Sequence, residues 1–254
     1  LALITGGCGG LGMAFARSWL QRGGSVRLAD MVSQKKGDEA CQQLGNNVEF
    51  VSCDVTDKEQ LREAFANAED LSLVINNAGI VGALGPLEST TAEEWQFTLD
   101  ILLNGVFFGM KHASKHMKQA RSGSIISMSS VAGVTGGLGP HAYAAAKHAV
   151  VGITRNLAAE VCAFGVRVNC IAPYSVATPM VAQAYLDDHT DIDSTLKMLT
   201  DESPLSGRPG LADDVANAVL WLASDESGYT SGHTLTIDAG ITTGSMAGPP
   251  RFSE

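Results

Sequence analysis

The sequence predicts a single α/β domain in which helices cover both faces of a parallel sheet. Short apolar runs rich in β-branched residues alternate with longer helix-forming stretches along the whole chain. This alternation is typical of a doubly wound fold, because each parallel strand is followed by a helical crossover. The 254 residues contain no internal repeat, low-complexity tract or linker, so one domain over residues 1–254 is the simplest interpretation.

Seven apolar runs are expected to form the strands. They are rich in Val, Ile and Leu without strict alternation, as expected for strands buried on both faces. The runs cover residues 1–5, 25–30, 48–54, 71–79, 124–130, 166–173 and 233–238. The sheet is therefore expected to have seven parallel strands.

Helices are expected between these runs. The clearest candidates cover residues 11–23, 59–69, 93–120, 141–165 and 212–225. One long interval, from Thr178 to about Pro209, contains no strand. Because it follows the carboxyl end of a strand, where such folds bind ligands, we expect a substrate lid over about 179–208. The segment 245–254 is too rich in Gly and Pro to be helical.

The composition narrows the function classes. At 45% hydrophobic and 17% charged residues, the chain is expected to be globular with a large core. A net charge of −10 argues against a nucleic-acid partner. No apolar run reaches membrane length and no signal peptide is evident, so we expect a cytoplasmic protein without a membrane partner. The chain begins inside an expected strand, so a few residues are expected to precede Leu1.

Metal and disulfide chemistry are not expected. The five cysteines are scattered and form no C-x-x-C pair, which favours reduced thiols. His112 and His116 have the i, i+4 spacing of metal ligands, but the stretch around them is typical of a solvated helix face. The acidic run LDDHTDID lacks the spacing of a calcium loop. We therefore expect no metal site.

A glycine-rich turn joins the first expected strand to the first expected helix. In LALITGGCGGLGMAF, the residues Gly6, Gly10 and Gly12 leave the backbone open to a pyrophosphate. The start of a helix offers N–H groups and a favourable dipole to such a group. Glycine turns are common in other contexts, but this one has the strand–turn–helix setting of a dinucleotide site.

The second expected strand ends in Asp30, which bears on the cofactor. An acid at this point can accept both hydroxyls of the adenosine ribose and repels a 2′-phosphate. Neither Gly9 nor Met31 supplies a positive charge there, although Lys35 and Lys36 lie not far downstream. The sequence therefore predicts NAD rather than NADP.

Further motifs give the chain a resemblance to the short-chain dehydrogenase/reductase family. TGGCGGLG fits the T-G-x-x-x-G-x-G pattern of that family, and CDV, NNAG, GSIISMSS, YAAAK and RVNCIAPYSVATP follow in the family's order. The resemblance covers almost the whole chain and implies a Rossmann-type fold that binds a nicotinamide cofactor. The cofactor contacts that it implies are Gly6, Gly10, Leu11, Gly12, Asp30, Asp54, Val55, Asn77, Gly79, Tyr143, Lys147, Val176 and Thr178.

The same resemblance implies the catalytic residues. Tyr143 and Lys147 are four residues apart, so on a helix they share one face. Tyr143 is implied to take the alcohol proton while hydride passes to the nicotinamide, with Ser130 orienting the substrate oxygen. An ammonium about 4 Å from a phenolate is worth roughly 4 kcal/mol at an effective dielectric constant of about 20. We therefore expect Lys147 to lower the pKa of Tyr143.

Two positions depart from the family pattern. Leu102 stands where the family usually has the Asn that binds a proton-relay water. Asn104 is two residues further on and faces another direction unless the helix is distorted by a local bulge. Tyr174 replaces the common Gly after Pro173, which either narrows the pocket or gives it an aromatic wall.

RVNCIAPYSVATP and DESGYTSGHTLTIDAG look most like family members that oxidise bulky apolar cyclic alcohols, namely secoisolariciresinol and borneol-type (terpenol) dehydrogenases. We expect an NAD-dependent dehydrogenase of a terpenoid- or steroid-like secondary alcohol, with His141, Tyr174 and Met180 near the substrate. The alternatives are a 3-oxoacyl or other ketone reductase, which normally prefers NADPH, and a non-catalytic NAD-sensing protein. The family resemblance further implies a homotetramer.

Overall fold

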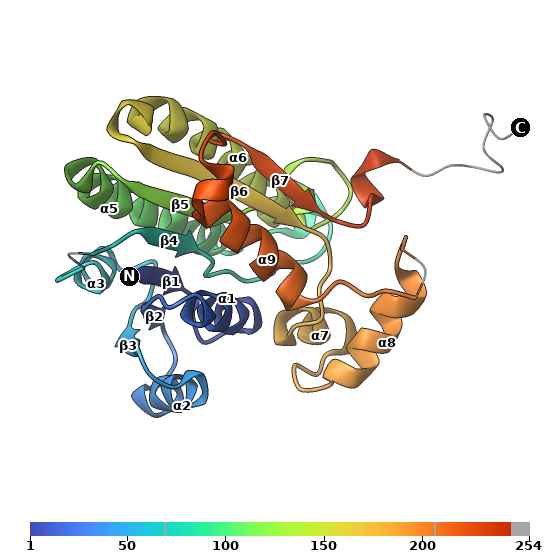
Figure 1. The fold of residues 1–254 in the computed structure, drawn as a ribbon. Helices are drawn as coiled ribbons and strands as arrows, with labels where there is room; N and C mark the ends of the chain where they lie inside the picture. Colours follow the sequence, from blue (N-terminus) through green and yellow to red (C-terminus); the bar gives the residue numbers. More distant parts are fainter. Residues whose placement is uncertain (69, 206, 245–254) are drawn as a thin grey trace, which may run out of the picture.

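The computed structural model describes residues 1–68, 70–205 and 207–244, and it contains one sheet of seven parallel strands. The strand order is β3-β2-β1-β4-β5-β6-β7, the doubly wound order that the sequence predicts (Figure 1). The strands are β1 (Ala2–Thr5), β2 (Val26–Asp30), β3 (Val48–Ser52), β4 (Leu73–Asn76), β5 (Gly123–Met128), β6 (Val166–Pro173) and β7 (Thr234–Ile237). Each of the seven expected strands is confirmed.

The helices of the described residues cover both faces of this sheet. They are α1 (Gly10–Gln21), α2 (Gln34–Leu44), α3 (Lys58–Ala64), α4 (Ala92–Leu99), α5 (Gly105–Ala120), α6 (His141–Val161), α7 (Pro179–Leu186), α8 (Ile192–Glu202) and α9 (Ala212–Ala223). Along β1, Leu3 points into one core cluster while Ala2 and Ile4 point into the other. This alternation is the two-residue period of a strand and explains why both strand faces are apolar.

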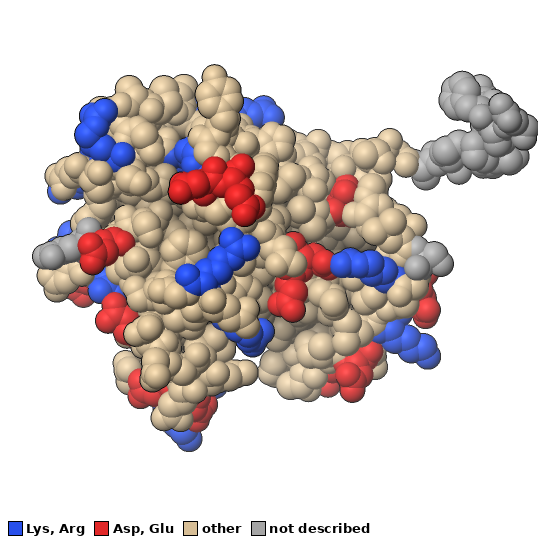
Figure 2. All heavy atoms as spheres, in the orientation of Figure 1, with Lys and Arg blue, Asp and Glu red and all other residues tan. Residues whose placement is uncertain are grey.

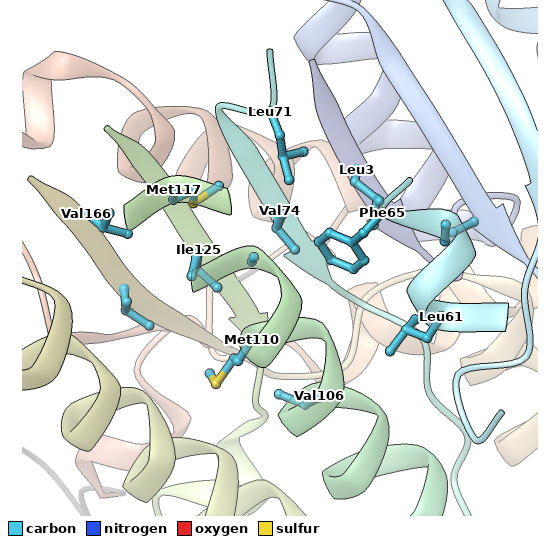
Figure 3. Packing of buried hydrophobic residues seen from close by; sticks show 14 of the residues in the cluster. Leu3, Leu61, Phe65, Leu71, Val74, Val106, Met110, Met117, Ile125 and Val166 are labelled. Atoms are coloured by element: carbon cyan, nitrogen blue, oxygen red, sulfur yellow. The ribbon is translucent and has the colours of Figure 1, made fainter. Parts of the chain in front are cut away.

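Two core clusters hold the helices to the sheet. The cluster with α3, α5 and α6 places Phe65, Val106 and Met110 against Val74 and Ile125 of the strands (Figure 3). The other cluster packs residues of α1 and α9 against the opposite face. Burial of one aliphatic or aromatic side chain contributes about 1.5–3 kcal/mol to the stability of the fold. The two clusters therefore hold the strand ends that carry the site in place.

The stretch 93–120 is helical, as the sequence predicts, but it is not α-helical throughout. Between α4 and α5, the residues Asp100–Asn104 form a π-helical turn. A π-helical turn adds a residue to the helical turn and changes the directions of the side chains near it. The place of this widening does not show in the sequence, because it leaves the apolar pattern of the helix nearly unchanged.

The interval after β6 contains two helices, α7 and α8, which pack against each other (Figure 1). Thr178 caps α7 by accepting a hydrogen bond from the N–H of Val181 at 3.4 Å, and Pro179 occupies the first helical turn. The helix α2 was not singled out in the sequence. The expectation for the segment 245–254 lies outside the described residues.

His112 and His116 do not form the solvated face that the sequence suggested. Both rings stack on Phe65 of the core. The ring centroid of His112 lies 5.4 Å from that of Phe65, and the centroid of His116 lies 6.2 Å from it. Within the described ranges, no three His, Cys, Asp or Glu side chains come together as metal ligands would.

None of the described helices has the length and apolarity to cross a bilayer. On the face shown in Figure 2, Lys and Arg side chains are scattered among Asp and Glu.

Candidate active site

A cavity of about 860 Å³ opens at the carboxyl ends of the central strands. The strand order reverses there, between β1 and β4, and open α/β sheets bind their ligands at such a switch point. Its walls include all but one of the expected cofactor and catalytic residues. Those present are Gly6, Gly10, Leu11, Asp30, Asp54, Val55, Asn77, Gly79, Ser130, Tyr143, Lys147, Val176 and Thr178.

The exception is Gly12, which supports the glycine turn from behind. A Cβ at Gly12 would lie 2.4 Å from the carbonyl oxygen of Gly6, so only glycine lets α1 pack this closely on the turn. Gly6 itself has a φ of +61°, and a Cβ there would lie 2.8 Å from Ala78 Cα. Gly10 opens α1, and its backbone faces Thr178 and Pro179 at the start of α7. The turn thus contacts both β4 and the α7 segment.

Asp30 lies beside this turn and is held by backbone donors. Its Oδ2 accepts a hydrogen bond from the N–H of Cys8 at 2.9 Å, and its Oδ1 accepts one from Val32 at 3.3 Å. Burial, with the nearby charge of Asp30, raises the pKa of the Cys8 thiol to about 12, so Cys8 is an unreactive part of the turn. Lys35 is exposed and pairs with Glu39 at 4.0 Å, and it does not line the cavity.

Hydrogen bonds join the end of β4 to the glycine turn. Thr5 Oγ1 accepts from the backbone N–H groups of Asn77 and Ala78 at 3.0 and 3.1 Å. The Asn77 side-chain amide donates to the carbonyl oxygens of Thr5 and Gly6 at 2.9 and 3.0 Å. The NNAG motif therefore positions the turn through Asn77 as well as lining the cavity.

Ser130, Tyr143 and Lys147 meet on one wall of the cavity. Ser130 follows β5, and its Oγ accepts a hydrogen bond from the N–H of Ala132 at 3.2 Å. Tyr143 and Lys147 lie on α6, with the Lys147 Nζ 5.4 Å from the centroid of the Tyr143 ring. The ammonium of Lys147 is buried and donates to the carbonyl oxygen of Met128 at 2.7 Å.

The expected lowering of the Tyr143 pKa is not found in this structure. Burial raises the pKa of Tyr143, and a hydrogen bond with Ser130 acts in the opposite direction. Burial also lowers the pKa of Lys147 to about 8. Burial therefore acts against the charged form of both groups. The expectation took account of the attraction between the two groups but omitted the cost of burying them.

Leu102 occupies the cavity wall and Asn104 does not. Leu102 is fully buried, and a Cβ on Gly79 would lie 3.2 Å from its Cδ2. Asn104 donates from its side-chain amide to Asp100 Oδ1 at 2.7 Å. The bulge that we considered is thus present as the π-helical turn, but it does not bring Asn104 into the cavity.

The substrate side of the cavity is apolar. Tyr174 and Met180 line it as expected, whereas His141 is exposed at the start of α6 and lies outside it. Residues two apart on a helix lie on nearly opposite faces, so His141 points outward when Tyr143 points into the cavity. Other apolar side chains of this wall were not predicted: Ile80, Phe97, Ile101 and Leu138. The i, i+4 spacing of Phe97 and Ile101 was the only signal in the sequence.

Comparison with known proteins decides the family. The family model described as enoyl-(acyl carrier protein) reductase matches residues 7–242. The chain is 41% identical over 253 residues to (+)-borneol dehydrogenase 2 of Salvia officinalis, covering 95% of this chain and 89% of that protein. The chain belongs to the short-chain dehydrogenase/reductase family. Members of this family are oxidoreductases that use NAD(P).

Other family members show the same extent of similarity. Xanthoxin dehydrogenase of Arabidopsis thaliana is 41% identical over 256 residues, covering 95% of this chain and 89% of that protein. Secoisolariciresinol dehydrogenase of Forsythia intermedia is 36% identical over 249 residues, covering 95% and 88%. The crystal structure of levodione reductase superposes with a TM-score of 0.85 at 33% identity, covering 96% of this chain and 98% of that one. The family resemblance seen in the motifs is confirmed.

Proposed function

We propose that this protein is an NAD-dependent dehydrogenase that interconverts a bulky apolar secondary alcohol and its ketone. The observation that carries this proposal is that Ser130, Tyr143 and Lys147 share one cavity with a largely aliphatic and aromatic wall. Relatives named for borneol and secoisolariciresinol support a cyclic, terpenoid- or steroid-like substrate.

Each residue of the wall has a defined task in this proposal. Ser130 holds the substrate oxygen by a hydrogen bond, and Tyr143 accepts the hydroxyl proton during oxidation. Lys147 is held in place by Met128, from which position it faces the phenol ring. NAD, when bound, supplies the hydride acceptor and a cationic ring that favours the phenolate.

The residues around the glycine turn fit NAD better than NADP. Asp30 presents a carboxylate at the end of β2, where a 2′-phosphate would be repelled. Lys35 and Lys36 are exposed and do not line the cavity. We assign Gly6, Gly10 and Leu11 to the pyrophosphate, and Asp54 and Val55 to the adenine side.

The α7–α8 segment serves as the substrate lid in this proposal. Met180, Val181 and Tyr185 of α7 form part of the cavity wall, while much of α7 and α8 is exposed. A segment with so little buried surface can open at low cost. Closure would exclude water from Tyr143 and the substrate carbon.

Two other functions make different predictions. A 3-oxoacyl or other ketone reductase would prefer NADPH, which the position of Asp30 disfavours. A non-catalytic NAD sensor is favoured only by Leu102, because Ser130, Tyr143 and Lys147 are all in place.

For the whole protein we propose a cytoplasmic homotetramer that binds neither nucleic acid nor membranes. The exposed Phe107 on α5 supports contact between subunits.

A turnover assay tests the proposed function. The purified protein is incubated with NAD or NADP and with borneol, androstanediol and a small linear secondary alcohol, and NADH formation is followed by absorbance. We expect NAD-dependent oxidation of the cyclic alcohols and little oxidation of the linear one. Faster reduction of a 3-oxoacyl thioester with NADPH would favour the reductase, and NAD binding without turnover of any alcohol or ketone would favour the sensor.

A further inference from the structure

A second cavity, of about 370 Å³, lies directly behind one wall of the candidate active site. It is formed between the end of α8, the start of α9 and strand β7, and is lined in part by Glu202, Ser203 and Thr236. The two cavities share three wall residues, Tyr174, Ser175 and Val176. The boundary between them is therefore built by the segment that follows β6.

The backbone of this boundary is fixed, so its side chains decide whether the two cavities connect. The N–H of Tyr174 donates to the carbonyl oxygen of Ile237 at 2.9 Å, and the N–H of Ala177 donates to Gly210 at 3.0 Å. A Cβ on Gly210 would lie 3.1 Å from Val176 Cγ1, which places the Val176 side chain against the Gly210 backbone. Of the three shared residues, only Tyr174 has a large side chain that could be removed without disturbing this packing.

Tyr174 lies at the boundary, since it lines both cavities. Burial raises the pKa of Tyr174, and the neighbouring acidic groups of Tyr185 and Glu202 raise it further. Tyr185, on α7, lines the first cavity only, and Glu202, at the end of α8, lines the second cavity only. Tyr174 thus shares the wall of the first cavity with Tyr185 and the wall of the second cavity with Glu202.

The second cavity differs from the first in its polar groups. Arg208 and Asp214 are already paired at 3.1 Å, and Asp238 accepts hydrogen bonds from the backbone of Gly240 and Thr242, each at 2.9 Å. Glu202 and Ser203 offer a carboxylate and a hydroxyl at the cavity wall. A ligand group entering here would have to carry hydroxyls that donate to such acceptors.

We propose that Tyr174 is a specificity-determining partition: it favours compact over long secondary alcohols by closing off the second cavity, which can hold the hydroxyl-bearing far end of a longer alcohol. This inference rests on the proposed function, since it takes the reacting alcohol to lie beside Tyr143. It assigns the preference for shorter substrates to one side chain. Removing that side chain should join the two cavities and strengthen the binding of tetracyclic alcohols relative to bicyclic ones.

The test measures binding without turnover, in a Tyr143→Phe background with saturating NAD. Equilibrium dialysis gives the Kd of borneol and of androstanediol, a steroid with a hydroxyl group at each end. Tyr174→Ala removes the partition, and Tyr174→Phe retains the ring as a matched control. We expect Tyr174→Ala to lower the Kd of androstanediol at least tenfold relative to that of borneol, and Tyr174→Phe to leave this ratio within about threefold.

A further substitution locates the far end of the steroid. Ser203 lines the second cavity and not the first, so Ser203→Phe in the Tyr174→Ala protein should fill the second cavity and abolish the gain. An unchanged gain would overturn the proposal. If Tyr174→Ala impairs NAD binding, Tyr174→Val replaces it and should give a smaller gain in the same direction.

The outcomes separate this inference from the proposed function. Oxidation of borneol by the unmutated protein, together with an unchanged androstanediol ratio in Tyr174→Ala and Tyr174→Val, would retain the function and overturn the partition. The tenfold gain in binding, with no turnover of either alcohol by the unmutated protein, would overturn the proposed function and retain the partition.

Discussion

The Nζ of Lys147 lies over the Tyr143 ring, 5.4 Å from its centre. Its hydrogen bond goes to the Met128 carbonyl at 2.7 Å, at the end of β5. Two elements therefore orient the pair, because α6 presents both side chains on one face and β5 supplies the acceptor that holds Lys147.

Replacing Tyr143 by Phe should remove the proton acceptor and leave the packing unchanged. We expect kcat to fall by several orders of magnitude, because no other side chain takes over the proton, while the Kd of NAD changes little. Steady-state NADH formation and calorimetric NAD binding measure the two effects. Retention of a tenth of the activity would show that Tyr143 is not the base.

The burial of Lys147 predicts a pH dependence of stability. Its pKa falls from 10.5 when exposed to about 8 in the folded protein, so between these values the unfolded chain binds more protons. Stability contributed by Lys147 should therefore rise with pH through this window, by on the order of 3 kcal/mol in total.

Urea unfolding of the unmutated protein and of Lys147→Met, at pH values from 7.5 to 10.5, isolates this contribution. We expect the unmutated protein to gain stability relative to Lys147→Met as the pH rises. A difference that stays constant across the window would contradict a lowered pKa for Lys147.

Replacing Asp30 by Ala should weaken NAD binding and reduce the preference of the enzyme for NAD over NADP. The substitution removes both a hydrogen-bond acceptor for the ribose and a charge that repels a 2′-phosphate. We expect the ratio of kcat/KM for NAD over NADP to fall at least tenfold. Asp30→Asn is the matched control, since it removes the charge and retains an acceptor oxygen. Equal use of both cofactors by the unmutated protein would refute the argument.

Leu102 should be tolerated at the position where the family usually has Asn. Tyr143, Lys147 and Ser130 supply the main catalytic contributions, so Leu102→Asn should change kcat by less than about tenfold, or under roughly 1.4 kcal/mol. Asn104→Ala should also have less than a tenfold effect, because Asn104 bonds to Asp100 outside the cavity. A hundredfold loss of kcat in Asn104→Ala would show that Asn104 enters the cavity during catalysis. If the unmutated protein is nearly inactive and Leu102→Asn restores activity, the NAD sensor is favoured.

The α7–α8 segment should become protected when the site is filled. Residues 182–199 are largely exposed, so their amide hydrogens should exchange quickly in the free protein. Exchange should slow when NAD and borneol are added, if the segment closes over them. Hydrogen exchange followed by mass spectrometry measures this, with the buried face of α6 as an internal reference. Equal protection in both states would identify the segment as fixed structure.

The sequence by itself determined the strands, their parallel direction and the residues at their carboxyl ends. Strand burial shows in short apolar runs. The glycine turn follows the first of these runs and Asp30 ends the second, so local patterns were sufficient. For the same reason Ser130, Tyr143 and Lys147 could be found from motifs whose spacing fits one strand end and one helix face.

The tertiary structure decided whatever depends on neighbours distant in the chain. The stacking of His112 on Phe65 joins α5 to α3, and the π-helical turn redirects side chains without altering the apolar pattern. The pKa of Tyr143 depends on how deeply α6 and β5 bury it, which spacing along a helix does not reveal. Tyr174 lines two cavities because α7, α8 and β7 come together near the end of β6, and this arrangement is a property of packing rather than of any single segment.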